Sequence, residues 1–310
     1  KESGAARVTR RTERLRRPHE FGMALQVLPQ ACAAHPGDVL GQFGYVLKHV
    51  DLMALTGHKR KASIKTVACY FDRFSKSVKD LSESGVHLVN LKELSLKHIR
   101  LLVSKWEAQG LSASTIANRF TILHRILVWV GKDDSACVLP DLLNDPANGR
   151  RQLVTEEGRS FMAVGLDVAE VLRDIREQSE LAGIQCELML WFGLRPEEAV
   201  MLIPSEADLG DRIRVERGTK GGRPREVPLV RPEQRAVLDR AIAFARSNAA
   251  GPGTLREYRD ITLKQAKRRL GYIARRVGPT RNNGVTPYSF RHEFSEWMYQ
   301  HLCGSKTPVM

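Results

Sequence analysis

The sequence predicts a mainly α-helical protein with one small antiparallel β-sheet, arranged as two domains. Its 310 residues exceed one domain of ordinary size and allow two hydrophobic cores. The first half has apolar residues at helical spacing and no alternating strand pattern, whereas the second half adds two short alternating segments between helices. An apolar content of 42% and a charged content of 27% are typical of a globular chain.

The first domain is expected over residues 21–132, after a basic arm at residues 1–20. The arm either follows a DNA backbone or is a solvated tail, and these alternatives are about equally supported. Apolar periodicity predicts helices at 21–34, 40–55, 63–81 and 94–109. A fifth helix begins after Ser112 or Ser114, either of which can cap it, and carries a stripe with Phe120 and Leu127.

A linker is expected at residues 133–160, where glycine, proline and aspartate interrupt any long periodicity and leave room for one short helical turn. The second domain then covers residues 161–310. Helices are predicted at 168–181, 186–192 and 232–246, from residue 263, and from about Tyr288, with Asp167 and Thr262 as N-caps. Alternation predicts strands at 212–216 and 225–230, separated by glycines that suit a turn.

The net charge is the first indication of function. Forty-nine Lys and Arg against 35 Asp and Glu give a formal charge of +14. Such a charge attracts polyanions, chiefly nucleic acid, by phosphate contacts and counterion release. A basic but inert surface is the alternative. No apolar run has the length of a membrane span, and no helix combines a basic face with aromatic anchors, so a membrane partner is not expected.

Several classes of chemistry have no signature here. The five cysteines form no CxxC pair and no zinc-like cluster with histidine, which predicts a reduced, cytoplasmic protein without a structural metal. The motifs GxSxG, HExxH, GxGxxG and the P-loop do not occur. The basic residues are therefore the candidates for the chemistry.

The first candidate motif runs from Trp191 to Val200. An apolar helix ends at Gly193, Arg195 follows, and Pro196 suits the first turn of a new helix. Glu198 lies where it can hold the guanidinium, and a planar two-pronged donor in this setting suits a phosphate. The competing interpretation is a salt bridge between Arg195 and Glu198 with a structural role alone.

The second motif is the segment from Gly218 to Leu229, which predicts a β-hairpin with Lys220 near its tip. A hairpin can insert a lysine into a groove and aim its ammonium at a leaving oxygen. An ordinary exposed turn is the alternative.

The third motif is the segment from Thr286 to Phe294. It begins a helix with Tyr288 three residues before Arg291 and on the same face, followed by His292. Helix N-termini favour anions. The alternative is a plain helix surface with Phe290 and Phe294 in the core.

Taken in order, the three motifs resemble the tyrosine recombinase family, the phage-type integrases. The stretch Gly-Leu-Arg-x-x-Glu is similar to the family's first arginine box, Thr-Lys-Gly-Gly with Val-Pro-Leu to its lysine hairpin, and Thr-Pro-Tyr-Ser-Phe-Arg-His to its second box. Leu-Ser-Ala-Ser-Thr-Ile at 111–116 resembles the family's helical, SAM-like core-binding domain. The resemblance covers roughly residues 60–300 and implies an α+β catalytic domain in the second half.

The resemblance implies a role for each motif residue. Arg195 and Arg291 grip the scissile phosphate and stabilise the pentavalent transition state, and Lys220 protonates the leaving 5′ oxygen. Glu198 and His292 support them. A tyrosine hydroxyl forms a 3′-phosphotyrosyl link that conserves bond energy, so neither a metal nor another cofactor is expected.

The chain departs from the family pattern in two places. Tyr288 stands where the family usually has histidine; a phenol can donate a hydrogen bond to phosphate, but with a reference pKa of about 10 it is a poor general base. The family's third box and its nucleophile lie further downstream than the 19 residues after Arg291. We expect both beyond Met310 and do not assign Tyr299, which is too close to Arg291 and falls inside the predicted helix.

The expected partner is double-stranded DNA at attachment or inverted-repeat sites, bound by a homotetramer in the prokaryotic cytosol or nucleoid. A non-catalytic DNA-binding protein of the same fold and an unrelated RNA-binding protein are the alternatives. Ten residues are candidate DNA contacts: Arg10, Arg11, Lys59, Arg60, Lys61, Thr115, Arg119, Arg223, Lys264 and Arg268.

Overall fold

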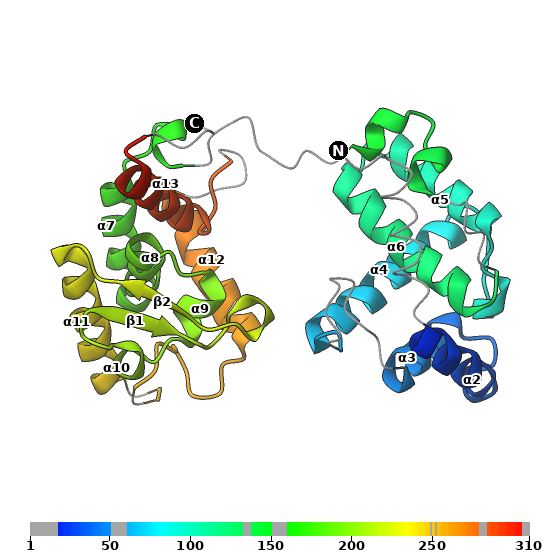
Figure 1. Ribbon diagram of the computed structural model, residues 1–310, viewed down its shortest axis with the longest axis horizontal. Coiled ribbons are helices and arrows are strands. Elements are labelled where there is room, and N and C mark those ends of the chain that lie inside the picture. Colours follow the sequence, from blue (N-terminus) through cyan, green and yellow to red (C-terminus); the bar gives the residue numbers. More distant parts are fainter. Residues whose placement is uncertain are drawn as a thin grey trace. The chain divides into compact units, whose positions relative to one another are not determined.

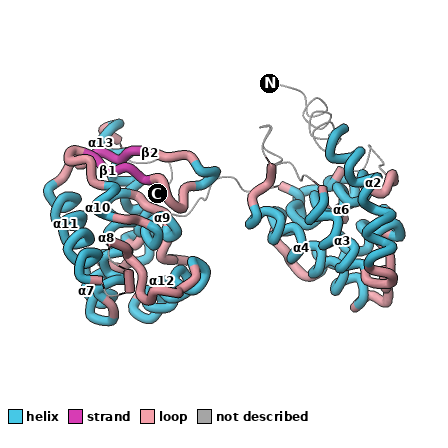
Figure 2. Tube along the Cα trace, turned by 90° about the horizontal axis from the view of Figure 1, so that it is seen from below, coloured by secondary structure: helices cyan, strands magenta, loops and turns pink. Residues whose placement is uncertain are grey.

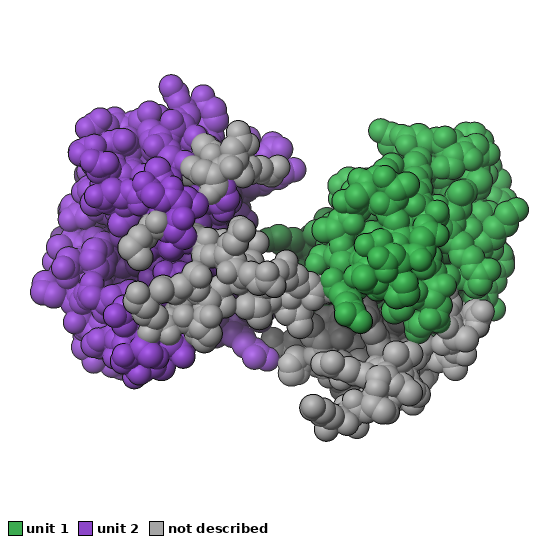
Figure 3. All heavy atoms as spheres, turned by 90° about the horizontal axis from the view of Figure 1, so that it is seen from above, with its two compact units in different colours: residues 1–152 green, residues 153–310 purple. Residues whose placement is uncertain are grey.

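The computed structural model describes residues 18–50, 61–132, 138–150, 160–248, 250–251, 253–278 and 284–305. Within this part, helices predominate and the only paired strands form one two-stranded sheet (Figure 2). The chain divides into two compact units, residues 1–152 and 153–310 (Figures 1 and 3). Each unit has its own hydrophobic core, so the predicted fold class is confirmed.

Every helix or strand element in the described residues of unit 1 is helical. Its helices are α2 (Pro18–Ala34), α3 (Val39–His49), α4 (Ile64–Ser82), α5 (Leu96–Ala108) and α6 (Ala113–Trp129), with the short 3-10 turns η1 (Leu91–Glu93), η2 (Leu139–Leu142) and η3 (Pro146–Gly149). Ser112 caps α6, its hydroxyl accepting a hydrogen bond from the Thr115 amide. Helix α6 contacts α2, α4 and α5 and is buried along most of its length from Ile116 on.

A buried ion pair ties three helices of unit 1 together. Arg125 on α6 donates two hydrogen bonds to Glu20 on α2, at 2.6 and 2.7 Å, and a third to the hydroxyl of Tyr70 on α4. Trp129 also donates to Glu20. Because both charges are almost fully buried, removal of one partner would leave the other as an unpaired charge in the core and destabilise the unit.

Part of the predicted linker belongs to unit 1. Turns η2 and η3 pack against α5 and α6. The carboxylate of Glu107 on α5 accepts hydrogen bonds from the Asn144 amide and the Asn148 side chain, at 2.8 and 3.1 Å. The linker prediction for residues 133–160 is therefore wrong for residues 138–150, whose polar groups bind a helix of the first unit.

Unit 2 is built around α8 (Glu180–Phe192), which contacts α7 (Val168–Gln178), α11 (Pro232–Ser247), α12 (Leu263–Val277) and α13 (Ser289–Cys303) (Figure 1). The short helices α9 (Pro196–Met201) and α10 (Pro204–Ala207) and the turn η4 (Met162–Val164) complete its helical part. Helix α8 is buried on nearly every face, including Leu188, Met189 and Phe192. An element covered on all sides fits an apolar sequence without a polar stripe.

The two strands form a hairpin. Strand β1 (Arg212–Val215) pairs antiparallel with β2 (Arg225–Pro228), with Ile213 opposite Val227 and both side chains in the core. The turn between them contains the 3-10 turn η5 (Lys220–Gly222). Gly218, Gly221 and Gly222 have φ of 72°, 76° and 65°, a backbone region that glycine adopts without steric cost.

The predicted helices of unit 2 are confirmed, but the end of the first and the start of the second differ from the prediction. The sequence predicts a helix over 168–181 and another from 186, but the chain breaks at Ser179. There the Ser179 hydroxyl accepts a hydrogen bond from the Ala182 amide and begins α8 six residues earlier than predicted. Asp167 and Thr262 cap α7 and α12 as expected.

Candidate active site

The first arginine lies at the junction of α8 and α9. Helix α8 ends at Gly193, which has the left-handed φ of 59° that lets the chain turn sharply. Arg195 follows at the N-cap position of α9, and Pro196 fills the first helical position. The Arg195 side chain is 31% exposed, so it is rooted in the fold while part of it faces solvent.

Glu198 is the buried acceptor that fixes this arginine. Its carboxylate is fully buried and accepts hydrogen bonds from the Arg195 backbone amide at 2.7 Å and from the Arg195 guanidinium at 2.8 Å. The predicted pairing of Glu198 with Arg195 is therefore confirmed. Arg225 on β2 donates to both oxygens of the same carboxylate, at 2.6 and 2.7 Å.

The third motif meets the first at the carbonyl of Gly193. Arg291, in the first turn of α13, donates a hydrogen bond to that carbonyl, and Arg225 approaches the same oxygen at 3.4 Å. Helix α13 packs closely here, because a Cβ added at Gly193 would lie 2.3 Å from the Phe294 ring. The structure thus brings Arg195, Arg225 and Arg291 around one carboxylate and one carbonyl.

The pKa shifts agree with this crowding of cations. The hydrogen bond to Glu198 raises the pKa of Arg195 and outweighs the effect of burial. Burial lowers the pKa of Arg291, and the positive charges of Arg195 and Arg225 lower it further. Burial opposes ionisation of Glu198, but hydrogen bonds from Arg225 and Arg195 dominate and hold the pKa of its carboxyl below the usual value. One carboxylate therefore faces three guanidinium groups, which leaves an excess of positive charge for an anion.

Tyr288 lies beside these arginines. It immediately precedes α13, the residue is 37% exposed, and its phenol adds to the effects that raise the pKa of Arg195. The ring of His292 packs edge-on against it, with the ring centroids 5.2 Å apart. A phenol at this position can donate a hydrogen bond to an anion held by the arginines.

Lys220 is not joined to the arginines by a hydrogen bond or ion pair within the described residues. It is exposed in the hairpin turn. The base of that turn lies on α9, since a Cβ added at Gly218 would be 2.9 Å from the carbonyl oxygen of Glu197. The lysine hairpin therefore adjoins the helix that begins with Arg195, with its ammonium in solvent.

Comparison with known proteins identifies the family. A family profile described as "Integrase" matches residues 154–296, and a second, described as "Phage integrase, N-terminal", matches residues 48–136. The chain belongs to the tyrosine recombinase family. The tyrosine recombinase XerA of Thermococcus kodakarensis is 32% identical over 108 residues, which cover 35% of this chain and 38% of that protein. The match thus spans less than half of this relative.

Solved tyrosine recombinase structures share the fold at low sequence identity. A lambda integrase tetramer bound to a Holliday junction is 12% identical, covers 84% of this chain and 71% of its own, and has a TM-score of 0.52. A Tn1549 transposon integrase in complex with transposon right end DNA is 14% identical, with coverages of 90% and 87% and a TM-score of 0.53. XerH bound to a palindromic difH substrate is 16% identical, with coverages of 90% and 77% and a TM-score of 0.51.

The candidate DNA contacts have different environments. Arg10, Arg11, Lys59 and Arg60 lie outside the described residues. Lys61, Arg223, Lys264 and Arg268 are exposed, and Thr115 is half-buried in the first turn of α6. None of these residues belongs to the arginine cluster.

Arg119 differs from its predicted role. Its guanidinium forms an ion pair with Asp80 at 2.7 Å and lies over the Trp106 ring, 5.1 Å from the centroid. The Trp106 indole donates to the same carboxylate. Because the side chain is only 15% exposed, we correct its assignment from a DNA contact to a link between α4, α5 and α6.

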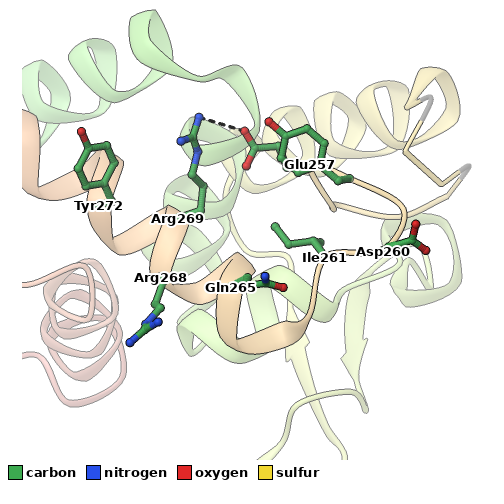
Figure 4. Close-up of a pocket in the computed structure, with 8 residues that line it drawn as sticks. Glu257, Asp260, Ile261, Gln265, Arg268, Arg269 and Tyr272 are labelled. Carbon is green, nitrogen blue, oxygen red and sulfur yellow. Dashed lines mark ion pairs between the residues drawn. The ribbon is translucent and has the colours of Figure 1, made fainter.

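A separate pocket of about 650 Å³ lies along α12 (Figure 4). An ion pair between Glu257 and Arg269 at 3.2 Å crosses it, and Tyr258 and Tyr272 are exposed in its lining. The pocket shares no residue with the arginine cluster. On the other side of α12, Lys267 forms an ion pair with Glu197 at 2.8 Å and so joins the helix to α9.

Sequence reasoning missed Arg225. It stands just before Val-Pro-Leu, inside the second motif, but nothing in a strand pattern indicates a partner 27 residues earlier. The one sequence feature that could have indicated a site role for Arg225 is its charge at the start of an otherwise alternating strand. In the described residues, no helix is long and apolar enough to cross a membrane, and no three His, Cys, Asp or Glu side chains are grouped to hold a metal.

Proposed function

We propose that this protein is a site-specific DNA recombinase that acts through a 3′-phosphotyrosyl intermediate. The observation that carries the proposal is the meeting of Arg195 and Arg291, from motifs about a hundred residues apart, at one partly exposed cationic site. Two preorganised guanidinium groups can bind the non-bridging oxygens of one phosphodiester and stabilise the charge that develops on them.

The remaining motif residues complete the proposed reaction. A tyrosine hydroxyl attacks phosphorus and releases its proton to water, the bond between phosphorus and the 5′ oxygen breaks, and Lys220 gives a proton to the leaving 5′ oxygen. Tyr288 donates a hydrogen bond to the phosphate, and Glu198 and His292 support the site. We place the nucleophile beyond Met310 and not at Tyr299, which lies inside α13. The phosphotyrosyl bond keeps the energy of the original bond, so the reverse attack by a 5′ hydroxyl can rejoin a strand.

Double-stranded DNA is the proposed substrate, and a homotetramer on DNA the proposed assembly. The formal charge of +14 supports DNA as the partner. The lambda integrase with a similar fold is a tetramer on a Holliday junction, which supports the assembly.

The proposed function is tested by covalent capture on DNA. The full natural protein is incubated with a pool of duplexes that carry a nick beside randomised sequence, so that the short fragment dissociates after cleavage and traps the adduct. We expect a covalent protein–DNA band that survives denaturation, and recovery of one preferred sequence. Arg291→Ala should reduce its formation by about 10²–10³-fold, because one preorganised donor to the transition state is lost, while duplex binding changes little.

A matched control is Arg173→Ala, which removes an exposed arginine of the same unit whose ion-pair partner is Asp174. We expect it to form the adduct at the wild-type rate. Sequence-selective DNA binding without any adduct in the full natural protein would instead support the non-catalytic alternative. Adduct formation that survives Arg291→Ala would remove Arg291 from the site.

A further inference from the structure

Within the described site, Arg225 is the only residue that contacts both Glu198 and the Gly193 carbonyl, the two groups that hold the proposed phosphate-binding arginines. Its guanidinium donates to both oxygens of Glu198, at 2.6 and 2.7 Å, and approaches the Gly193 carbonyl at 3.4 Å. Glu198 holds Arg195, and the Gly193 carbonyl holds Arg291. A continuous chain of hydrogen bonds therefore runs from Arg195 to Arg291 through Arg225.

The donors of Arg225 are directed at protein atoms. Both terminal nitrogens of its guanidinium donate to the Glu198 carboxylate, and one of them also approaches the Gly193 carbonyl. The side chain is 28% exposed. A guanidinium with this geometry orients its neighbours and is not the group that grips the substrate. Lysine could not replace it, because one ammonium is a point donor and lacks the planar fork.

The electrostatics of the cluster also depend on Arg225. Glu198 is fully buried, and the Arg195 guanidinium donates to only one of its oxygens, so Arg225 supplies the guanidinium donor to the other. With its carboxylate shared between two arginines, Arg195 keeps donors available on its exposed side. The charge of Arg225 also acts on Arg291, whose guanidinium is half-buried.

We propose that Arg225 is a positioning residue that couples the two phosphate-binding arginines, so that both are aimed at one phosphodiester at the same time. This proposal rests on the proposed function. It assigns to the hairpin a second task besides presenting Lys220: the first residue of β2 fixes the relative orientation of α9 and the start of α13.

The experiment compares cleavage of two substrates by the full natural protein. Both are nicked duplexes of the sequence recovered by covalent capture; one has a normal scissile phosphodiester, and the other has a methylphosphonate, in which a methyl group replaces one charged non-bridging oxygen. We expect Arg225→Ala to slow single-turnover cleavage of the phosphodiester by about 100-fold, since a small misplacement of catalytic groups has an effect of this size. The loss on the methylphosphonate should be at least tenfold smaller, and the Kd for the duplex should change less than threefold.

The matched control is Arg212→Ala. Arg212 lies on the neighbouring strand and pairs with Glu226 at 2.9 Å, so the variant removes an arginine–carboxylate pair of the same sheet without touching Glu198. We expect its cleavage rates on both substrates to equal those of the wild type. If wild type and this control form no adduct on any substrate, the proposed function fails; if both do and Arg225→Ala matches them, the positioning role alone is overturned.

Two further variants separate positioning from folding. Arg225→Lys should have a melting temperature closer to that of the wild type than Arg225→Ala has, because it restores the positive charge. Its cleavage rate should stay low, because an ammonium lacks the planar pair of donors. Arg225→Met combined with Glu198→Gln removes both the arginine and the buried charge, so it should fold and still cleave slowly. Wild-type cleavage by either variant, or an equal loss on both substrates by Arg225→Ala, would overturn the proposal.

Discussion

At the scale of single residues, one buried carboxylate organises the site. Glu198 accepts four hydrogen bonds, one from a backbone amide and three from two guanidinium groups, with no exposure to water. Breaking a buried ion pair by removal of one partner costs much more than loss of a surface pair, because the remaining charge is left buried. Stability and site geometry therefore depend on the same side chain.

Glu198→Gln should lower the free energy of unfolding of unit 2 by about 3 kcal/mol at neutral pH. The amide keeps the shape of the carboxylate but leaves two arginines without their counter-charge. Chemical denaturation followed by circular dichroism measures the change. Glu226→Gln, which affects an exposed pair with Arg212, should cost less than about 1 kcal/mol, and an equal effect of the two substitutions would contradict the special role of burial.

The contribution of Glu198 should also depend on pH in a defined direction. Since the folded protein lowers the pKa of its carboxyl, the stabilisation is fully present above the unfolded-state value near 4.5 and is lost as the pH falls through the lower folded value. The difference in stability between wild type and Glu198→Gln should therefore be constant from pH 7 to about pH 5 and shrink below it. A difference that stays constant down to pH 2 would show that folding does not lower the pKa of this carboxyl.

Single residues also show where sequence reasoning succeeds and where it cannot. Arg195 and Glu198 are three residues apart on one helix turn, so their pairing follows from local geometry and was predicted. Arg225 and Arg119 find their partners 27 and 39 residues away, through contacts that only the folded chain creates. For that reason the sequence alone indicates neither the contacts of Arg225 with Glu198 nor the ion pair of Arg119 with Asp80.

At the scale of elements, helix starts are predictable where a capping residue directly precedes the apolar pattern. Ser112, Asp167 and Thr262 each accept a hydrogen bond from an amide in the first turn that follows, which is a local rule of capping. The cap at Ser179 follows the same rule, but it lies inside the helix predicted at 168–181, so the sequence pattern does not reveal the start of α8. Residues 138–150 contain turn-forming residues typical of a linker, and only their contacts with Glu107 show that they belong to unit 1.

Gly193→Ala should disrupt the docking of α13 on α8. The residue has a left-handed φ of 59°, and a Cβ there would lie 2.3 Å from the ring of Phe294. We expect a loss of at least about 2 kcal/mol in unfolding free energy, from backbone strain and overpacking together, measured by thermal denaturation. Gly210→Ala is the matched control, because Gly210 has a φ of 91° but no neighbour within 4 Å of the added Cβ; equal losses in both variants would show that Phe294 adds nothing.

At the scale of the whole molecule, the two hydrophobic cores have no residue in common. We therefore expect residues 18–150 and residues 160–305 to fold when expressed separately, each with a cooperative thermal transition. Calorimetry of the two fragments and of the intact chain tests this. A fragment that remains unfolded alone would show that its core is completed by the other unit.

The excess of positive charge should make DNA binding strongly dependent on salt. With six to ten phosphate contacts, affinity for duplex DNA should fall by about 10³–10⁵-fold between about 50 and 200 mM salt. Fluorescence anisotropy with a labelled duplex measures the slope. A slope near zero would mean that the charge of +14 does not act on phosphates.

Gly193 constrains which substitutions the junction of α8 and α13 can accept. Its carbonyl accepts a hydrogen bond from Arg291, and the ring of Phe294 fills the space that a side chain at residue 193 would occupy. The two stretches therefore have to change as a matched set: a chimaera that imports residues 191–198 from a homologue with a bulkier residue at 193 should need that homologue's residue at 294 as well. Libraries that diversify one stretch alone would consist mostly of misassembled proteins, whereas joint randomisation of 193 and 294 would reveal which combinations are compatible.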